Sequence, residues 1–145
     1  MINATIEKFG HPATLIREYQ HWVVLLRPSQ VTLGSLVLAA KSPATAYGQL
    51  PVSAFAEQAV VVGDIERALG AFCGFERINY LMLMMVDPHV HFHVIPRYEG
   101  TRDWNGIAFG DASWPGPPDL KAAVGLDAEQ IALLRDDVAR AFSSH

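Results

Sequence analysis

The sequence predicts an α+β fold, in which an antiparallel sheet of about five strands carries one long helix, with a further helix at the C-terminus. Three observations predict it. Short apolar and β-branched runs, which are typical of strands, recur through the first hundred residues. Apolar residues recur at helical spacing over 53–73. A second helical pattern follows a capping sequence at Asp127.

The composition predicts one globular domain over residues 1–145. Half of the residues are hydrophobic and 18% are charged, which excludes a disordered chain and leaves enough apolar surface for a core. No apolar run approaches the ~18 residues of a membrane span, and no N-terminal targeting signal is visible. We therefore expect a cytoplasmic protein without a membrane partner. The net charge of −4, with no basic run, argues against a nucleic-acid partner.

The first forty residues are predicted to contain an antiparallel pair of strands. Residues 22–26 form an unbroken apolar run, and a second run covers 34–40 after a short polar connection. A weaker strand is predicted at 13–18. The segment 9–12 reads Phe-Gly-His-Pro and is expected to be a loop, because Gly and Pro interrupt regular structure.

The long helix is predicted to begin near Ser53, because Pro51 and Ser53 suit a first helical turn, and to end at Gly74. An almost wholly apolar strand is predicted over 75–85. A tight turn at 86–88, Val-Asp-Pro, is then expected to lead into the next strand.

The stretch 98–118 has no periodicity and is predicted to be irregular. Trp104 and Trp114 lie in it. Two interpretations of these tryptophans stay open: the segment covers a site or a partner, or the side chains pin it to the body of the domain.

Three of the six histidines stand at alternate positions, His89, His91 and His93, separated by single apolar residues. The alternation is typical of a strand, in which successive side chains point to opposite faces. The three imidazoles are therefore expected on one face, while the apolar residues between them point into a core. A row of imidazoles adds little stability, so the pattern indicates a site.

Three interpretations of the row compete. The first is a half-exposed strand that carries histidine by chance. The second is a metal site, since imidazole is a common metal ligand. The outer two residues of the row lie about 13 Å apart in a straight strand, so a metal would need an outside ligand such as Asp87 or Glu99. The third is nucleophilic catalysis, in which one imidazole attacks and its neighbours fix its tautomer and move protons.

The pattern of residues 89–95, His-Val-His-Phe-His-Val-Ile, resembles the motif of the histidine triad (HIT) family of nucleotide hydrolases and transferases. The pair Pro96-Arg97 that follows is also common in that family. The likeness extends more weakly over about 13–51 and the helix after it. The last forty-five residues are not diagnostic.

The resemblance implies a HIT-like fold and a mechanism. His91 would be the nucleophile that attacks the α-phosphorus of a small-molecule nucleotide and forms a nucleotidyl-histidine intermediate, which water resolves. His93 and His89 would donate hydrogen bonds to phosphate oxygens or carry the proton to the leaving group. Because related transferases have glutamine in place of the third histidine, His93 favours a hydrolase. The scheme requires no metal or cofactor, and the family commonly forms homodimers.

The resemblance also places a nucleoside pocket on the predicted strand pair. Leu26-Arg27 stand near an Asn-Arg-like position of the family, and Gly34-Ser35 near a Pro-Gly-His element. Both are departures from the family pattern. Trp22, Leu26 and Leu36 either form an apolar slot for the base or are plain core residues, and Arg27 is a candidate for substrate binding.

A third departure concerns the phosphate. Family hydrolases usually have a longer, glycine-rich loop before the row, whereas only Val86-Asp87-Pro88 is expected here. Asp87 is expected to hold a histidine or cap the turn, because an anion beside a phosphate is unfavourable. Phosphate binding would depend on backbone N–H groups, the histidines or Arg97. The alternative function is a HIT-like protein that binds nucleotides or a metal with little or no turnover.

Overall fold

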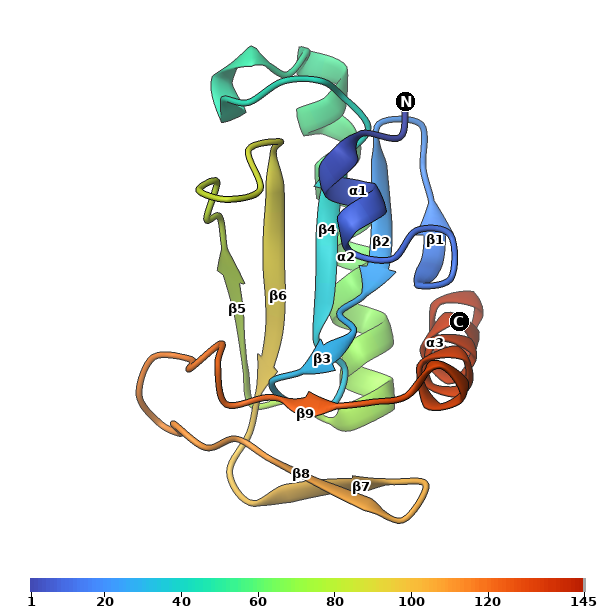
Figure 1. Cartoon of the computed structure of the whole chain (residues 1–145), viewed down its shortest axis with the longest axis vertical. Coiled ribbons are helices and arrows are strands. Elements are labelled where there is room, and N and C mark those ends of the chain that lie inside the picture. The colour runs from blue at the N-terminus through green and yellow to red at the C-terminus, as the bar shows by residue number, and fades with distance from the viewer. Residues whose placement is uncertain (145) are drawn as a thin grey trace.

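The computed structural model describes residues 1–144, and its centre is a five-stranded antiparallel sheet (Figure 1). The spatial order is β1-β2-β4-β6-β5, so β1 and β5 are the edge strands. This confirms the predicted fold class. The strands are β1 (Leu15–Glu18), β2 (Trp22–Leu26), β4 (Leu36–Ala40), β5 (Arg77–Leu81) and β6 (His91–Arg97).

Helices cover both faces of the sheet. The long helix α2 (Val52–Cys73) packs on one face and ends at Gly74, which adopts the left-handed conformation (φ 61°). The short helix α1 (Ala4–Lys8) crosses the opposite face, in front of the sheet in Figure 1. The C-terminal helix α3 (Ala128–Ser143) packs beside α2 and β1, and a capping box at Asp127 begins it as predicted. Within residues 1–144, no helix is long and apolar enough to span a bilayer.

The central strands are apolar on both faces because both faces are covered. On the α2 side, alternate residues of β2 and β4 join the large core that includes Ile65 and Leu69. The residues between them, Val23, Leu25, Val37 and Ala39, pack against Ile6 of α1 in a second, smaller cluster. Every one of these side chains is at most 1% exposed. The alternation of a strand therefore divides the sheet into an α2 face and an α1 face.

The prediction of an irregular segment over 98–118 is wrong in its first half. Strands β7 (Thr101–Trp104) and β8 (Ile107–Gly110) form a hairpin whose turn residues, Asn105 and Gly106, have φ of 50° and 78°. An Asn-Gly pair is the preferred sequence for such a turn. Trp104 donates from Nε1 to Asp137 of α3 (2.7 Å), which favours the interpretation that it pins the segment to the domain. Short strands β3 (Ser29–Gln30) and β9 (Val124–Gly125) pair nearby, and a 3-10 turn spans Tyr47–Gln49.

The segment 9–12 consists of turns, as predicted, but helix α1 just before it was not predicted. One further prediction is wrong. The strand predicted over 75–85 ends at Leu81 and β6 begins only at His91, so the connection covers 82–90 and is not a three-residue turn. The apolar run that suggested a longer strand is largely solvent-facing: Met85 and Val86 are each 84% exposed. The premise of a three-residue phosphate loop is therefore wrong.

The start of helix α1 is anchored to the sheet by the side chain of Asn3. The Asn3 carboxamide oxygen accepts from the backbone N–H of Ile6 and caps the helix (3.0 Å). Its amide nitrogen donates to the carbonyls of Ala40 (3.0 Å) and Ser42 (2.8 Å). Asn3 is 4% exposed. Because one buried carboxamide makes all three hydrogen bonds, Asn3 joins the N-terminus of α1 to the end of β4.

Replacing Asn3 by Ala is expected to lower the free energy of unfolding by about 2–4 kcal/mol, since it removes an N-cap and leaves buried carbonyls without a donor. Urea denaturation monitored by circular dichroism measures this. Asn3→Asp is the matched variant, because it keeps the capping oxygen but loses the donor. A variant Asn3→Asp as stable as the wild type would show that the two carbonyl bonds do not anchor α1.

Candidate functional site

The histidine row lies at the start of β6, on the α1 face of the sheet. His91 and His93 pair with Ala39 and Val37 of β4, and their rings meet edge to face with centroids 5.3 Å apart. His89 precedes the strand, and its Nδ1 lies 2.8 Å from the hydroxyl of Thr5 in α1. The structure therefore brings the three predicted histidines together beneath α1.

The tautomer of His91 follows from its partner. Its Nδ1 lies 2.7 Å from the carbonyl oxygen of His89. A carbonyl can only accept, so Nδ1 carries the proton and Nε2 presents a lone pair. His91 is fully buried, and within the described part of the chain its Nε2 is a buried polar atom without any hydrogen-bond partner. Native structures rarely leave such an atom unpaired unless it has a function.

His93 is held neutral with the opposite tautomer. Arg27 Nε donates to its Nδ1 over 3.4 Å, so in the neutral ring Nε2 carries the proton and is a donor. Burial lowers the pKa of His93 to about 4, and the positive charge of Arg27 and the neighbouring His91 act in the same direction. The carboxylate of Asp87 opposes them. With both rings neutral, the row thus offers the Nε2 lone pair of His91 beside the Nε2–H of His93.

Arg27 follows β2 and reaches the row from the side. Besides His93, its guanidinium donates to the carbonyl (2.7 Å) and hydroxyl (3.0 Å) of Ser29. Burial lowers the pKa of Arg27. Among the four residues predicted to bind substrate, Arg27 is the one that contacts the histidines.

Trp22 and Leu26 are not brought to the row. Both are fully buried on the α2 face, on the opposite side of the sheet from the imidazoles. Trp22 donates from Nε1 to the carbonyl of Ala54 in α2 (2.8 Å). The structure therefore favours the interpretation of these residues as core residues over that of an apolar slot for the base, because strand alternation points their side chains away from the site.

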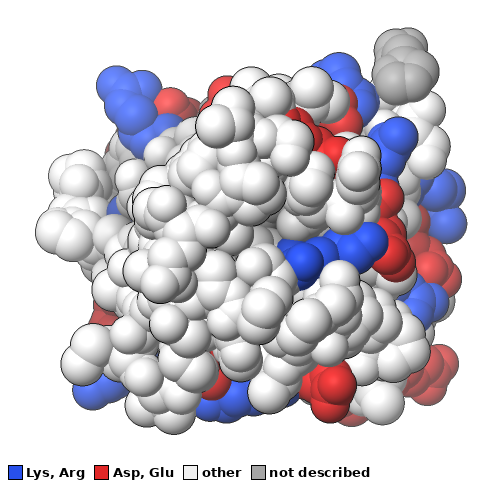
Figure 2. Space-filling view, turned by 90° about the horizontal axis from the view of Figure 1, so that it is seen from above, with Lys and Arg blue, Asp and Glu red and all other residues white. Residues whose placement is uncertain are grey.

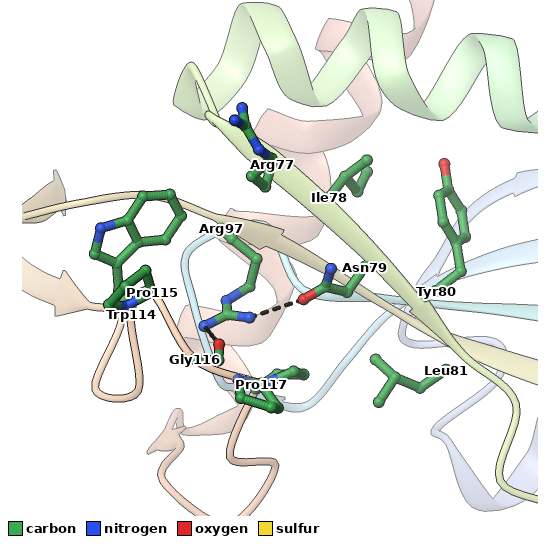
Figure 3. A pocket seen from close by; sticks show the side chains of 11 residues that line it. Arg77, Ile78, Asn79, Tyr80, Leu81, Arg97, Trp114, Pro115, Gly116 and Pro117 are labelled. Atoms are coloured by element: carbon green, nitrogen blue, oxygen red, sulfur yellow. Dashed lines mark hydrogen bonds between the residues drawn. The ribbon is translucent and has the colours of Figure 1, made fainter.

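Arg97 lies at the far end of β6, roughly 20 Å along the strand from His91, and binds the segment after β8 (Figure 3). Its guanidinium is 4% exposed and pairs with Asp111 through Nε (2.6 Å) and Nη2 (3.1 Å). It also donates to Asn79 (2.8 Å) and to the carbonyl of Gly116 (2.8 Å). These bonds use the donors of Arg97 within the protein, at a distance from the row.

A cavity of about 810 Å³ opens beside this cluster, between β5 and the loop with Trp114 (Figure 3). Its lining includes Asn79, Leu81 and Arg97 but none of the three histidines. Trp114 therefore lines a cavity at the edge of the sheet rather than the row itself.

Two α1 features escaped the sequence analysis. The Phe9 ring lies 5.6 Å from both the His91 and His93 rings, centroid to centroid. Thr5, 2% exposed, holds His89. The signal that could have found them is the spacing of Ile2, Ile6 and Phe9 around the N-cap residue Asn3, which is typical of a short amphipathic helix.

The metal interpretation gains no support from the geometry. Within residues 1–144, no group of three or more His, Cys, Asp or Glu side chains is arranged to hold a metal ion. Asp87, one of the two suggested outside ligands, forms an ion pair with Lys8 of α1 (2.6 Å). Glu99 follows β6 at the end remote from His89.

The surface near the row has few charges. The loop 82–90 exposes apolar side chains, and Leu83, Met85 and Val86 are each at least 46% exposed. Figure 2 looks onto this end of the molecule and shows charged side chains mainly toward the margins, with a wide uncharged area over the rest. Such a surface does not suit the phosphate backbone of a nucleic acid.

Comparison with solved structures finds histidine triad proteins throughout the matches described. A histidine triad protein from Sinorhizobium meliloti has a TM-score of 0.74 at 20% identity, covering 97% of this chain and 95% of its own. One from Bradyrhizobium japonicum has a TM-score of 0.73 at 20% identity, covering 97% and 96%. A hypothetical histidine triad nucleotide-binding protein from Sulfolobus tokodaii has a TM-score of 0.67 at 20% identity, covering 90% and 83%.

No protein-family model matches the chain, and no curated protein matches its sequence. At 20% identity, the likeness to these structures shows a shared fold. The chain thus has the fold of histidine triad proteins.

Replacing Asp111 by Ala is expected to lower the free energy of unfolding by about 3–5 kcal/mol, because Arg97 is then left charged and buried. Chemical denaturation measures the change. Asp136→Ala is the control: Asp136 pairs with Arg135 but its side chain is 51% exposed, so the loss is expected to stay below about 1 kcal/mol. Equal losses in the two variants would contradict a structural role for the Arg97 pair.

The lowered pKa of His93 predicts a pH dependence of stability. Between pH 6.5 and about 4 the unfolded chain binds a proton at His93 that the folded protein does not, so stability falls as the pH falls through this window. NMR titration should place the His93 midpoint near pH 4. In His93→Gln, the fall in stability over the same window should be smaller than in the wild type, and an equal fall would contradict the assignment.

Proposed function

We propose that this chain is a histidine triad hydrolase that cleaves a small-molecule nucleotide at its α-phosphate through a nucleotidyl-histidine intermediate on His91. The observation that carries the proposal is the unpaired Nε2 of His91, whose ring is oriented by the carbonyl of His89. A nucleophile in this state needs no base to deprotonate it, since the lone pair is already free.

In the first step, Nε2 of His91 attacks the phosphorus in line. The new N–P bond forms as the bond from phosphorus to the leaving group breaks, and the leaving group departs with the bonding electrons. In the second step, a water oxygen attacks the same phosphorus and its released proton passes to solvent, while the N–P bond breaks and its electron pair returns to Nε2. The Nδ1 proton stays directed at the His89 carbonyl, which stabilises the positive charge of the phosphorylated ring.

The neighbouring histidines would supply the remaining polar groups. The Nε2–H of His93 donates a hydrogen bond to a phosphate oxygen, with the charge of Arg27 close behind it. Thr5 orients His89, which donates to a phosphate oxygen or passes a proton to the leaving group. Phosphoryl transfer depends mainly on such positioning and charge stabilisation. In this scheme Arg27 acts through His93 and is a positioning residue.

The likeness to histidine triad proteins supports three further expectations. The bond cleaved is a P–N or phosphoanhydride bond, the protein assembles as a homodimer, and it is located in the cytoplasm. The solved structure from Sulfolobus tokodaii is described as a nucleotide-binding protein, which supports a nucleotide as the ligand. The open edge of β5 is a surface on which a second subunit could continue the sheet.

The test is hydrolysis of a panel with chelator present: an adenosine phosphoramidate, a dinucleoside polyphosphate and a nucleotide sugar. His91→Ala is expected to lower kcat by at least about 10³-fold while nucleotide affinity changes little, because the nucleophile is lost and the binding surface is kept. Initial rates and isothermal titration calorimetry measure the two quantities. Rapid quench of the wild type into alkaline denaturant, in which a bond between phosphorus and an imidazole nitrogen is stable, should trap a nucleotide on His91, detected by mass.

His21→Ala is the matched control, because it removes an imidazole outside the row. It should leave kcat unchanged. Turnover that survives in His91→Ala would overturn the proposed nucleophile. Binding without turnover by the wild type on every substrate would favour the alternative, a nucleotide-binding protein. Activity that disappears with chelator would instead indicate a metal-dependent reaction.

A further inference from the structure

The reacting nitrogen of the proposed nucleophile is covered in the free protein. His91 is 0% exposed, and its Nε2 neither contacts solvent nor has a hydrogen-bond partner among the described residues. On one side the His93 ring stands edge to face against it. Phe9 packs against both rings, with centroid distances of 5.6 Å. A phosphorus atom cannot reach Nε2 while these rings keep their positions, because N–P bond formation requires contact.

Phe9 is the movable member of this group. The backbone around it is fixed: its N–H donates to Thr5 (3.2 Å), and its carbonyl accepts from the hydroxyl of Thr14 (2.7 Å). Its ring is only partly buried and forms no polar bond. His93, in contrast, is tied to Arg27 and lies within a central strand. Side-chain rotation is fast and costs little compared with the movement of a strand.

We infer that Phe9 is a specificity-determining residue: its ring shields the Nε2 of His91, and a substrate reaches this nitrogen only by displacing the ring. The shielding is inferred from the burial of Nε2 together with the contact of the Phe9 ring with both imidazoles. The consequence for substrates rests on the proposed function.

Displacing the ring exposes apolar surface and so opposes binding. A substrate that carries a nucleoside can offset this with binding energy from groups away from the reacting phosphorus. A small phosphoryl donor lacks such groups. Phe9 therefore discriminates against small donors, and its removal should increase their reaction with His91 more than that of nucleotides.

Access is tested by acylation with diethyl pyrocarbonate at neutral pH, followed residue by residue through peptide mass spectrometry. An unprotonated imidazole nitrogen attacks a carbonyl carbon of the reagent, so that an N–C bond forms, the C–O bond of the anhydride breaks and ethyl carbonate leaves. The other ring nitrogen then gives up its proton. In the wild type, His91 should react at least about tenfold more slowly than the partly exposed His21. In Phe9→Ala the rate at His91 should rise by about tenfold or more, with His21 unchanged.

Phe55→Ala is the matched control, since it removes an aromatic ring from α2 on the other side of the sheet. It should not change the rate at His91. Phe9→Leu is a second variant that keeps much of the apolar contact, and it should give a smaller rise than Phe9→Ala. Wild-type His91 reacting as fast as His21 would overturn the inference without any variant. So would equal rates at His91 in Phe9→Ala and Phe55→Ala.

Specificity is tested with inorganic phosphoramidate. The reagent reacts in the form whose nitrogen is protonated. Nε2 of His91 attacks phosphorus and the N–P bond to the ring forms, while the P–N bond of the reagent breaks and ammonia leaves. Phosphorylated His91 is measured by mass. Phe9→Ala should raise this rate by a larger factor than it raises kcat/KM for an adenosine phosphoramidate. Equal factors would overturn the role in specificity. If no nucleotide is turned over, the proposed function fails, while the acylation rates still decide whether Phe9 shields His91.

Discussion

The hydrogen bond from His91 Nδ1 to the carbonyl of His89 is the constraint on which the site depends. An acceptor that cannot donate fixes the proton on one nitrogen and leaves the other as a lone pair. The bond exists because His89 lies just outside β6, where its carbonyl is not used by the sheet. Thr5 in turn holds the His89 ring, so α1 supports the nucleophile through a residue that is itself in the row.

The division of the sheet into two faces explains where the polar groups are. In β6, one set of alternate residues joins the α2 core and the other carries the imidazoles. The α1 face is almost as dry as the core, because Ile6 and its neighbours exclude water from it. Burial there keeps His93 neutral, as the direction of its pKa shift indicates. A dry site also strengthens the interaction of its dipoles with a bound phosphate.

Local sequence signals succeeded where one interaction dominates locally. Strand β2 was predicted with its observed bounds, and the capping box of α3 and the glycine end of α2 were placed correctly. Local sequence signals failed where a run of apolar residues lies outside a strand. Residues 82–90 read as strand and turn but form a loop, because no neighbouring strand pairs with them. The Asn105-Gly106 turn was readable from sequence, but the segment around it was treated as irregular.

The sequence by itself determined the fold class and the row of three histidines, because strand periodicity and the histidine pattern are local properties of the chain. Only the tertiary structure decided which side chains share the site. Trp22 and Leu26 face away from it, and Arg97 is bound to Asp111 at the other end of β6. Arg27 meets His93 from 66 positions away. Such contacts depend on which strands and helices become neighbours, and sequence spacing carries no information about that.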